Sequence, residues 1–261
     1  MYVLFILAAL AYAASSVAFG IEREDDDRLR RAGRICLAVA GIVHFLFIGA
    51  QSAVGAHPFQ SVFRVASFGA MLTVAGLFVV SRGRPMPAIG ALVAPLGLIG
   101  LVLGVVFGGV AIERAPASPT LARLHISLAT AGLAGFILAA GAAASYLAME
   151  RRLRSRRFKP RPGAISLAAL DRLHHRVMIV VTPIFTMAIV TGVLWIVRAG
   201  ELATFRERWF ELLIAGVAWL AAVALLGLRA ALGLRGRRAA SLTLIAFGCT
   251  LAILVFYGVR A

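Results

Sequence analysis

The stretch Ser118-Pro119-Thr120-Leu121-Ala122-Arg123-Leu124-His125 opens a long apolar segment that continues to Tyr146-Leu147-Ala148-Met149-Glu150-Arg151-Arg152. The Ser118 hydroxyl can cap free helix amides, and Pro119 suits the first helical turn because its φ is fixed. The residues between Arg123 and Glu150 carry no formal charge. They are numerous enough to cross a hydrocarbon core of roughly 30 Å. The segment therefore predicts a transmembrane helix.

The charges at its two ends predict the direction of this helix. The far end runs into a basic cluster, which the positive-inside rule places in the cytoplasm: Arg151, Arg152, Arg154, Arg156, Arg157 and Lys159. His125 is then expected near the outer boundary of the membrane. Its helix face continues through Ala129, Gly132, Phe136, Ala139 and Ala143. The small residues on this face let another helix, or a flat ligand, approach closely.

The composition indicates a membrane protein. Of the 261 residues 61% are apolar, and the apolar runs repeat at membrane-spanning length. The net charge of +16 falls mostly on arginines in short segments between these runs. That distribution is a topology signal and disfavours a nucleic-acid partner. We expect the basic inner loops to contact anionic lipid headgroups.

Eight apolar segments predict an all-α polytopic bundle of eight transmembrane helices, forming a single membrane domain with both termini outside. No Lys or Arg precedes the first segment, so we expect a retained helix in place of a cleaved signal peptide. The expected spans are about 2–19, 35–54, 63–80, 88–110, 121–148, 177–197, 209–228 and 239–257.

The segments between the spans carry further expectations. Glu22–Arg34 is expected to be a cytoplasmic loop, and Pro95 and Pro183 to bend their helices. Residues 165–176 alternate apolar and charged positions at helical spacing. This pattern predicts a short helix at the headgroup boundary, with His174 and His175 as ordinary members of it.

The predicted interior has no Asp, Glu, Lys or Arg deep in any span. Ion-coupled transporters usually keep such a group in the membrane, so this absence disfavours a transporter, although a small-molecule permease remains an alternative. There is no Gly-rich phosphate loop, His-Glu-x-x-His or nucleophile elbow, and we expect no enzymatic activity. Cys36 and Cys249 form no Cys-x-x-Cys, which excludes covalent haem attachment and a disulfide framework.

Histidine is the remaining polar chemistry near the outer side. His44 lies near the middle of its predicted span, His57 in the outer loop that follows, and His125 near the outer boundary. A buried imidazole needs a partner, which a neighbouring helix, the headgroups or haem iron could supply. The aromatic residues at this side fit either an interfacial belt or the cover of a haem site: Phe59, Trp195 and Trp209.

Several short segments carry a resemblance. The chain resembles the cytochrome c assembly membrane proteins of the CcsA/HemX-like type over nearly its whole length. The segments that carry it are Ile89-Gly90-Ala91-Leu92-Val93-Ala94-Pro95-Leu96, Leu124-His125, Tyr146-Leu147-Ala148-Met149-Glu150-Arg151-Arg152-Leu153, Leu170-Asp171-Arg172-Leu173 with Arg176, Gly192-Val193-Leu194-Trp195, Leu228-Arg229, and Leu234-Arg235-Gly236-Arg237-Arg238-Ala239-Ala240.

The resemblance implies a protein of the bacterial inner membrane that binds haem and presents it at the outer face for attachment to apocytochrome c, together with partner subunits. On this pattern His125 matches an outer-face haem ligand, and His44 is a candidate match for an intramembrane histidine. The alternative within the same resemblance is a HemX-like regulator of tetrapyrrole synthesis that acts through the basic loop 151–161.

The chain also departs from the pattern. Residues 200–209 hold one tryptophan, Trp209, where the family has a tryptophan-rich segment ending in Trp-Asp. Gly227 stands where the family has a histidine, and the chain ends at Ala261 before another. Three explanations follow: haem is held differently, a partner supplies ligands, or the protein is a HemX-like accessory.

Overall fold

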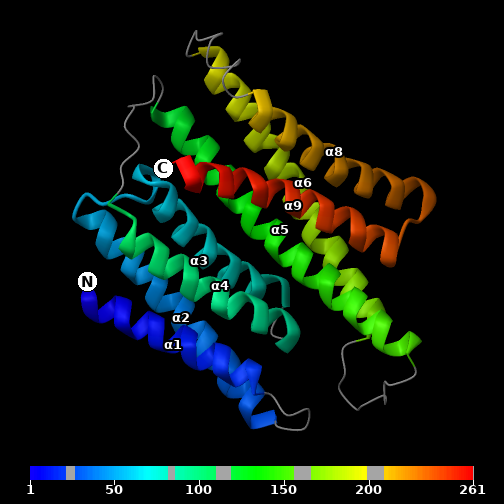
Figure 1. The fold of residues 1–261 in the computed structure, drawn as a ribbon, viewed down its shortest axis with the longest axis horizontal. Helices are drawn as coiled ribbons and strands as arrows, with labels where there is room; N and C mark the ends of the chain where they lie inside the picture. The colour runs from blue at the N-terminus through cyan, green and yellow to red at the C-terminus, as the bar shows by residue number, and fades with distance from the viewer. Residues whose placement is uncertain (22–26, 82–85, 110–118, 156–165, 199–208, 261) are drawn as a thin grey trace. The chain divides into compact units, whose positions relative to one another are not determined.

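A computed structural model describes the chain except for residues 22–26, 82–85, 110–118, 156–165, 199–208 and 261 (Figure 1). The described residues form helices and no strand, which confirms the predicted all-α class. The helices are α1 (Tyr2–Gly20), α2 (Asp27–Ala53), the 3-10 turn η1 (Pro58–Gln60), α3 (Val62–Ser81), α4 (Pro87–Val106), α5 (Pro119–Arg154), α6 (Leu167–Arg198), α8 (Trp209–Leu232) and α9 (Arg237–Arg260).

The number of apolar helices agrees with a polytopic membrane bundle. Within the described residues, 7 helices are long and apolar enough to cross a membrane: α1 to α6 and α8. The eighth predicted span, 239–257, lies within α9. The outward orientation of both termini stays a prediction.

Helix α2 begins earlier than expected. Residues 22–34 were predicted to form a loop, but the helix starts at Asp27, where the Asp27 carboxylate pairs with Arg30 at 2.8 Å. Gly33 then packs against Phe19 of α1, and the Ser15 hydroxyl donates to the Gly33 carbonyl at 2.9 Å. The loop prediction was therefore wrong for residues 27–34, because the Asp27–Arg30 pair and the contacts with α1 stabilise a helix there.

Helix α6 is continuous through the segment predicted to be a separate helix at the headgroup boundary. Its buried face runs without interruption from the charged start into the apolar part: Leu170, Leu173, His174, Val177, Met178 and Val181. The prediction of a separate helix over 165–176 was wrong because an amphipathic face suits a protein neighbour as well as a membrane surface. Here the face packs within the protein.

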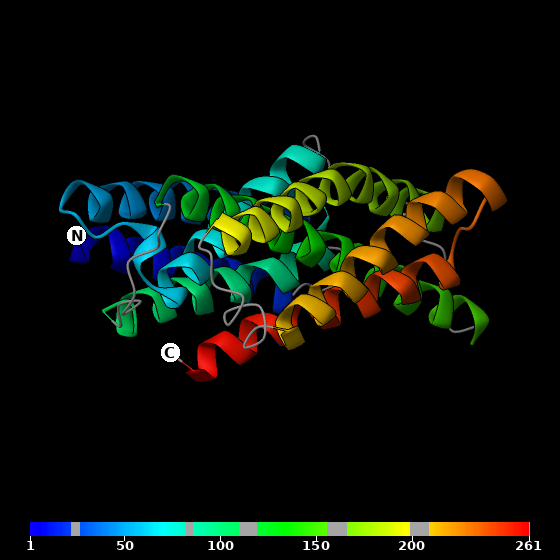
Figure 2. The same cartoon turned by 90° about the horizontal axis from the view of Figure 1, so that it is seen from above.

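The described helices group into two compact units. Unit 1 spans Met1–Ala115 with Gly258–Ala261 and contains α1 to α4; unit 2 spans Pro116–Tyr257 and contains α5, α6, α8 and most of α9. The single membrane domain expected from the sequence stays a prediction. In unit 2, α8 and α9 are antiparallel, and the turn that joins them has positive φ at Gly233 and Gly236 (Figure 2).

Close glycine contacts join α5 to α6. A Cβ on Gly135 would collide with Val181, and one on Gly132 would lie 3.3 Å from the Phe185 ring. Phe136 on the same face is fully buried and meets Phe185 edge-on at 5.1 Å. The small-residue face of α5 thus receives α6, the first of the two occupants expected for it. We call this contact the α5–α6 seam.

Replacing Gly135 by Ala tests the seam. The added methyl group would overpack the contact with Val181, and such changes typically cost about 1 to 3 kcal/mol of stability. Gly216→Ala on α8 is the matched control, because a Cβ there meets no atom within 4 Å. Unfolding by sodium dodecyl sulfate, followed by circular dichroism, should show a lower free energy of unfolding for Gly135→Ala and an unchanged one for Gly216→Ala. Equal stabilities of the two variants would contradict the packing described here.

Candidate functional site

His125 lies at the start of α5, with its ring held against α6. Its Nδ1 is 2.8 Å from the carbonyl oxygen of Ala188. A carbonyl only accepts hydrogen bonds, so in this contact Nδ1 carries the proton and donates it. This is the arrangement in which histidine most often binds a metal, with the second nitrogen oriented by a carbonyl or carboxylate.

The surroundings of His125 fix the ring from α6. A Cβ on Gly192 would lie 2.8 Å from the His125 Cε1, so only a glycine allows this approach. The Trp195 ring follows on the same helix, 6.0 Å from the imidazole and tilted by 47°. His125 itself is half-buried. The structure therefore brings together two of the sequence-predicted site residues, His125 and Trp195.

His44 occupies a different environment, in unit 1. It is fully buried, with Nδ1 3.1 Å from the Tyr12 hydroxyl and Nε2 2.9 Å from the Ser67 hydroxyl. The Tyr12 ring meets it edge-on at 5.8 Å. Both ring nitrogens thus have partners on neighbouring helices. A bond from His44 to iron would require one of these hydroxyls to move away, which favours a structural role.

The remaining predicted residues are spread over both units. In unit 1, His57 is exposed at the start of η1, and the Phe59 ring meets Phe68 at 6.2 Å. In unit 2, Trp209 is exposed and its ring contacts Phe210 at 5.8 Å. Among the described residues, no group of three or more His, Cys, Asp and Glu is placed to hold a metal ion.

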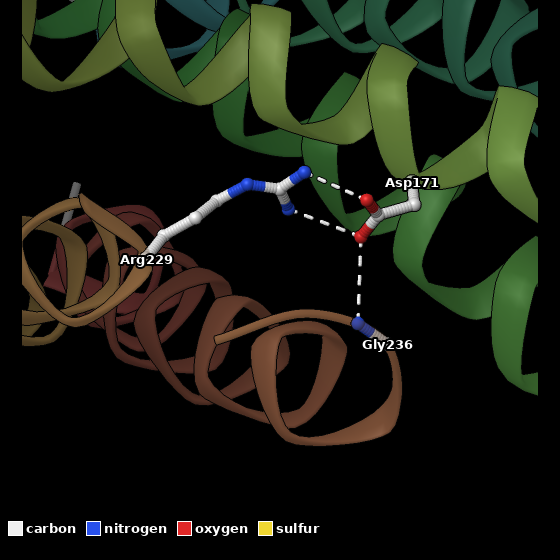
Figure 3. A network of polar contacts seen from close by, with 3 residues as sticks. All are labelled: Asp171, Arg229 and Gly236. Atoms are coloured by element: carbon white, nitrogen blue, oxygen red, sulfur yellow. Dashed lines mark hydrogen bonds and ion pairs between the residues drawn. The ribbon is translucent and has the colours of Figure 1, made fainter. Parts of the chain in front are cut away.

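A second polar cluster lies at the other end of the α5–α6 seam. The Asp171 carboxylate of α6 accepts two hydrogen bonds from the Arg229 guanidinium of α8, at 3.0 and 2.6 Å, and a longer one from the Gly236 amide at 3.4 Å (Figure 3). Both charged side chains are largely buried, with 16% and 9% exposed. We call this cluster the inner latch, because the basic residues predict this end to be cytoplasmic.

Two further contacts complete the inner latch. The His174 Nε2 lies 2.6 Å from the Thr243 hydroxyl of α9. A Cβ on Gly236 would lie 2.9 Å from the Tyr146 hydroxyl, and its φ is +69°, so glycine is required on both counts. Next to these groups lies a partly open pocket of about 10 Å³, close to the lower limit for one water molecule. Its lining is Ala143, Tyr146, Asp171, His174, Gly236 and Ala240.

This cluster could not be predicted from the sequence pattern. Asp171 and His174 were assigned to a surface helix and Arg229 to a topology signal. One signal was available: Asp171 and Arg229 carry opposite charges at the predicted inner ends of two spans. Of the predicted basic cluster, Arg151, Arg152 and Arg154 lie in the last turn of α5 and are exposed, and Arg154 pairs with Glu150 at 2.8 Å. Arg156 and Arg157 lie outside the described residues.

The comparison with known families adds the decisive observation. The family described as Cytochrome C assembly protein matches residues 2–261. The chain belongs to this family. No curated protein and no solved structure matches the chain. Family membership and the apolar helices together indicate a multi-pass membrane protein with a role in cytochrome c biogenesis.

The segments that carry the family resemblance meet in space in this cytochrome c assembly protein. The 124–125 segment lies against the 192–195 segment through the contact of His125 with Gly192. The segments 170–173, 228–229 and 234–240 meet through Asp171, Arg229 and Gly236. Within unit 2, these segments therefore meet in two polar clusters, one at each end of the α5–α6 seam, while the 89–96 segment lies in α4 of unit 1.

Haem is the cargo that the family implies, and the donor chemistry of His125 fits one axial position on its iron. The small-residue face of α5 does not fit the macrocycle, because Phe136, Ala139 and Ala143 are buried where α6 packs. A haem bound to His125 would therefore lie outside the α5–α6 seam.

Removing Arg229 should destabilise the assembly protein strongly. Arg229→Ala leaves the Asp171 carboxylate buried without its counter-charge, which typically costs about 3 to 5 kcal/mol. The control is Arg154→Ala, whose exposed pair with Glu150 is expected to contribute about 0.5 kcal/mol or less. Denaturant unfolding of the purified variants measures both.

The double variant Asp171→Ala/Arg229→Ala separates the pair from its surroundings. With both charges removed, the decrease in the free energy of unfolding should be smaller than the sum of the decreases for Asp171→Ala and Arg229→Ala alone. Additive losses would contradict a direct interaction between these side chains.

Proposed function

We propose that this assembly protein handles haem without catalysing a reaction, binding it through His125 and presenting it at the outer face of the bacterial inner membrane for attachment to apocytochrome c. The observation that carries the proposal is the contact between the His125 Nδ1 and the Ala188 carbonyl. This contact orients the imidazole ring, and Nε2 is the atom that would bind iron. Family membership supplies the context of cytochrome c biogenesis.

The distribution of arginines supports the outer location of His125. The opposite end of unit 2 carries exposed guanidinium groups with no acidic residue near them in the chain except Glu150 and Asp171, both of which are paired. The positive-inside rule then assigns that end to the cytoplasm, where anionic headgroups would contact these groups. The guanidinium groups belong to Arg151, Arg152, Arg172, Arg176, Arg235, Arg237 and Arg238.

We propose that a partner subunit shares the haem site. His125 supplies one ligand, and His44 is engaged by Tyr12 and Ser67. Gly227, which stands where the family resemblance would expect a histidine, is exposed and has no atom within 4 Å of an added Cβ. A second axial ligand from another chain would make this membrane protein one half of a haem-presenting pair.

Haem binding is tested by the absorption spectrum of the purified protein. Protein from haem-replete cells should show a Soret band, and His125→Ala should weaken it because the axial nitrogen is removed. His57→Ala, at an exposed position in unit 1, is the matched control and should leave the band unchanged. A colourless wild-type protein that cannot be reconstituted with haem, with and without co-purifying partners, would overturn the proposal.

A deletion strain separates haem presentation from the regulator alternative. Presentation at the outer face predicts loss of holocytochrome c with normal haem precursors, restored by the wild-type gene but not by His125→Ala. Normal cytochrome c with altered precursor levels would instead support a regulator of tetrapyrrole synthesis. Staining of c-type cytochromes by their haem peroxidase activity, with porphyrin analysis of the same cells, gives both readouts.

A further inference from the structure

Arg64 lies in the first turn of α3, in unit 1, and its charge is not neutralised within the described part of the chain. The Arg64 side chain is half-buried. Its Nη1 donates to the Oε1 of the exposed Gln60 at 2.9 Å, and its Nε is buried without a hydrogen-bond partner. No carboxylate of the described residues forms an ion pair with it. The guanidinium therefore still has the capacity to bind an anion.

Two contacts hold the Arg64 side chain in one place. The Gln60 amide group that accepts from Arg64 also donates to the carbonyl of Gly55 at 3.0 Å, so it is fixed by the preceding turn. The Arg64 stem packs over the residues that follow α4, where a Cβ on Gly108 would lie 3.1 Å from the Arg64 Cγ. A guanidinium that is already positioned loses less side-chain freedom when it binds a ligand.

Ser61, the residue before α3, carries a second polar group without a partner. Ser61 is 0% exposed, and its hydroxyl forms no hydrogen bond with the described residues. A serine at this position usually caps the helix by accepting from an amide two or three positions later, but this hydroxyl does not. The first amides of a helix also lack intrahelical acceptors. Because buried polar groups are rarely left unsatisfied, the start of α3 indicates a missing acceptor.

The start of α3 is expected at the outer boundary of the membrane. The opposite end of unit 1 holds the start of α2, which is basic: Arg28, Arg30, Arg31 and Arg34. The positive-inside rule assigns that end to the cytoplasm. Helices α2 and α3 are consecutive and are joined by the short segment 54–61, so α3 starts at the other end. Arg64 would then lie at the depth of the outer lipid headgroups.

We propose that the start of α3 is a binding site for one phosphate group, carried by an anionic lipid headgroup or by inorganic phosphate. Phosphate oxygens accept hydrogen bonds, and the donors here are a guanidinium, a hydroxyl and the free amides of a helix start. Arg64 supplies the counter-charge. A change of the Ser61 rotamer on binding turns its hydroxyl toward the ligand. A water molecule could satisfy the hydroxyl, but it would leave the charge of Arg64 unneutralised.

This site is independent of the proposed function. It lies in unit 1, contains neither His44 nor His125, and can be tested without haem. A protein that binds no haem would overturn the proposed function and leave the phosphate site untouched, and the converse also holds.

Photoreactive phosphatidylglycerol tests the lipid source. The full-length protein is reconstituted in vesicles that contain this lipid, illuminated and digested, and the labelled peptides are identified by mass spectrometry. The peptide around Arg64 should be labelled in the wild type. Arg64→Gln should reduce this labelling about 10- to 100-fold, the range expected for loss of a hydrogen bond to a charged group. Arg123→Gln is the matched control, because Arg123 is exposed at the predicted outer end of α5, and it should leave the labelling unchanged.

Phosphorus-31 NMR tests the second source. Inorganic phosphate added to lipid-depleted protein in detergent should show a saturable component of line broadening that disappears in Arg64→Gln. Specific labelling without this component would identify the lipid as the source, and the component without specific labelling would identify free phosphate. If Arg64→Gln changes neither readout, the proposal is wrong. Equal effects of Arg64→Gln and Arg123→Gln would also overturn it, because net charge would then explain both.

Ser61→Ala tests the buried hydroxyl. Without phosphate the variant should be at least as stable as the wild type, because it removes a buried group that has no partner. It should nevertheless lower the affinity for the phosphate source about 2- to 10-fold, the range for loss of a neutral hydrogen bond. Ser52→Ala, at the same end of unit 1, is the control; its hydroxyl bonds the Ile48 carbonyl at 2.9 Å. An unchanged affinity in Ser61→Ala would overturn the assignment of this hydroxyl to the site.

Discussion

The close approach of α5 to α6 is the constraint on which both polar clusters depend. Gly132 and Gly135 let α6 lie directly on α5, and Gly192 extends the contact to His125. The two helices run in opposite directions, so one end of the seam joins the start of α5 to the end of α6. The other end joins Tyr146 to the start of α6, where Asp171 meets Arg229. From His125 to Tyr146 the helical rise is about 30 Å, close to the thickness of a bilayer core.

That separation explains why polar chemistry sits where it does in unit 2. A charged or hydrogen-bonding group costs least at the two boundaries of the hydrocarbon, where water and headgroups are near. The Asp171–Arg229 pair joins α6, α8 and the turn before α9 at one end of the seam. His125 lies at the other end, held by a backbone carbonyl. The buried middle of α5 is left to small and aromatic residues, and it is filled by α6.

The helices and the family could be predicted from the sequence, because span length, arginine placement and short ordered segments are local features. The interactions across helices could not. Residues 165–176 have the same periodicity whether they face headgroups or protein, so the local pattern does not show that Asp171 meets Arg229, 58 positions later. The same holds for His44: its spacing places it in the bundle, but the sequence does not say that Tyr12 and Ser67 engage both ring nitrogens.

The sequence singled out His125 as a candidate, because an imidazole near the predicted outer end of a long uncharged span is chemically conspicuous. What it could not supply was the hydrogen-bond partner of Nδ1, which is a backbone carbonyl 63 positions away. The expected groove for a flat ligand was an equally fair deduction from small residues, and the structure resolves it in favour of a helix. Small side chains specify a close approach, but the partner is specified by the shape of the opposite surface, here Val181 and Phe185.

Chemical rescue is the most direct measurement of the central claim, that the His125 imidazole binds haem iron. Haem-loaded His125→Gly protein should have an altered Soret spectrum, and free imidazole should restore the wild-type spectrum by entering the space that the side chain vacates. The same imidazole concentration should leave the wild-type spectrum unchanged. A His125→Gly protein whose spectrum matches the wild type before imidazole is added would contradict the account.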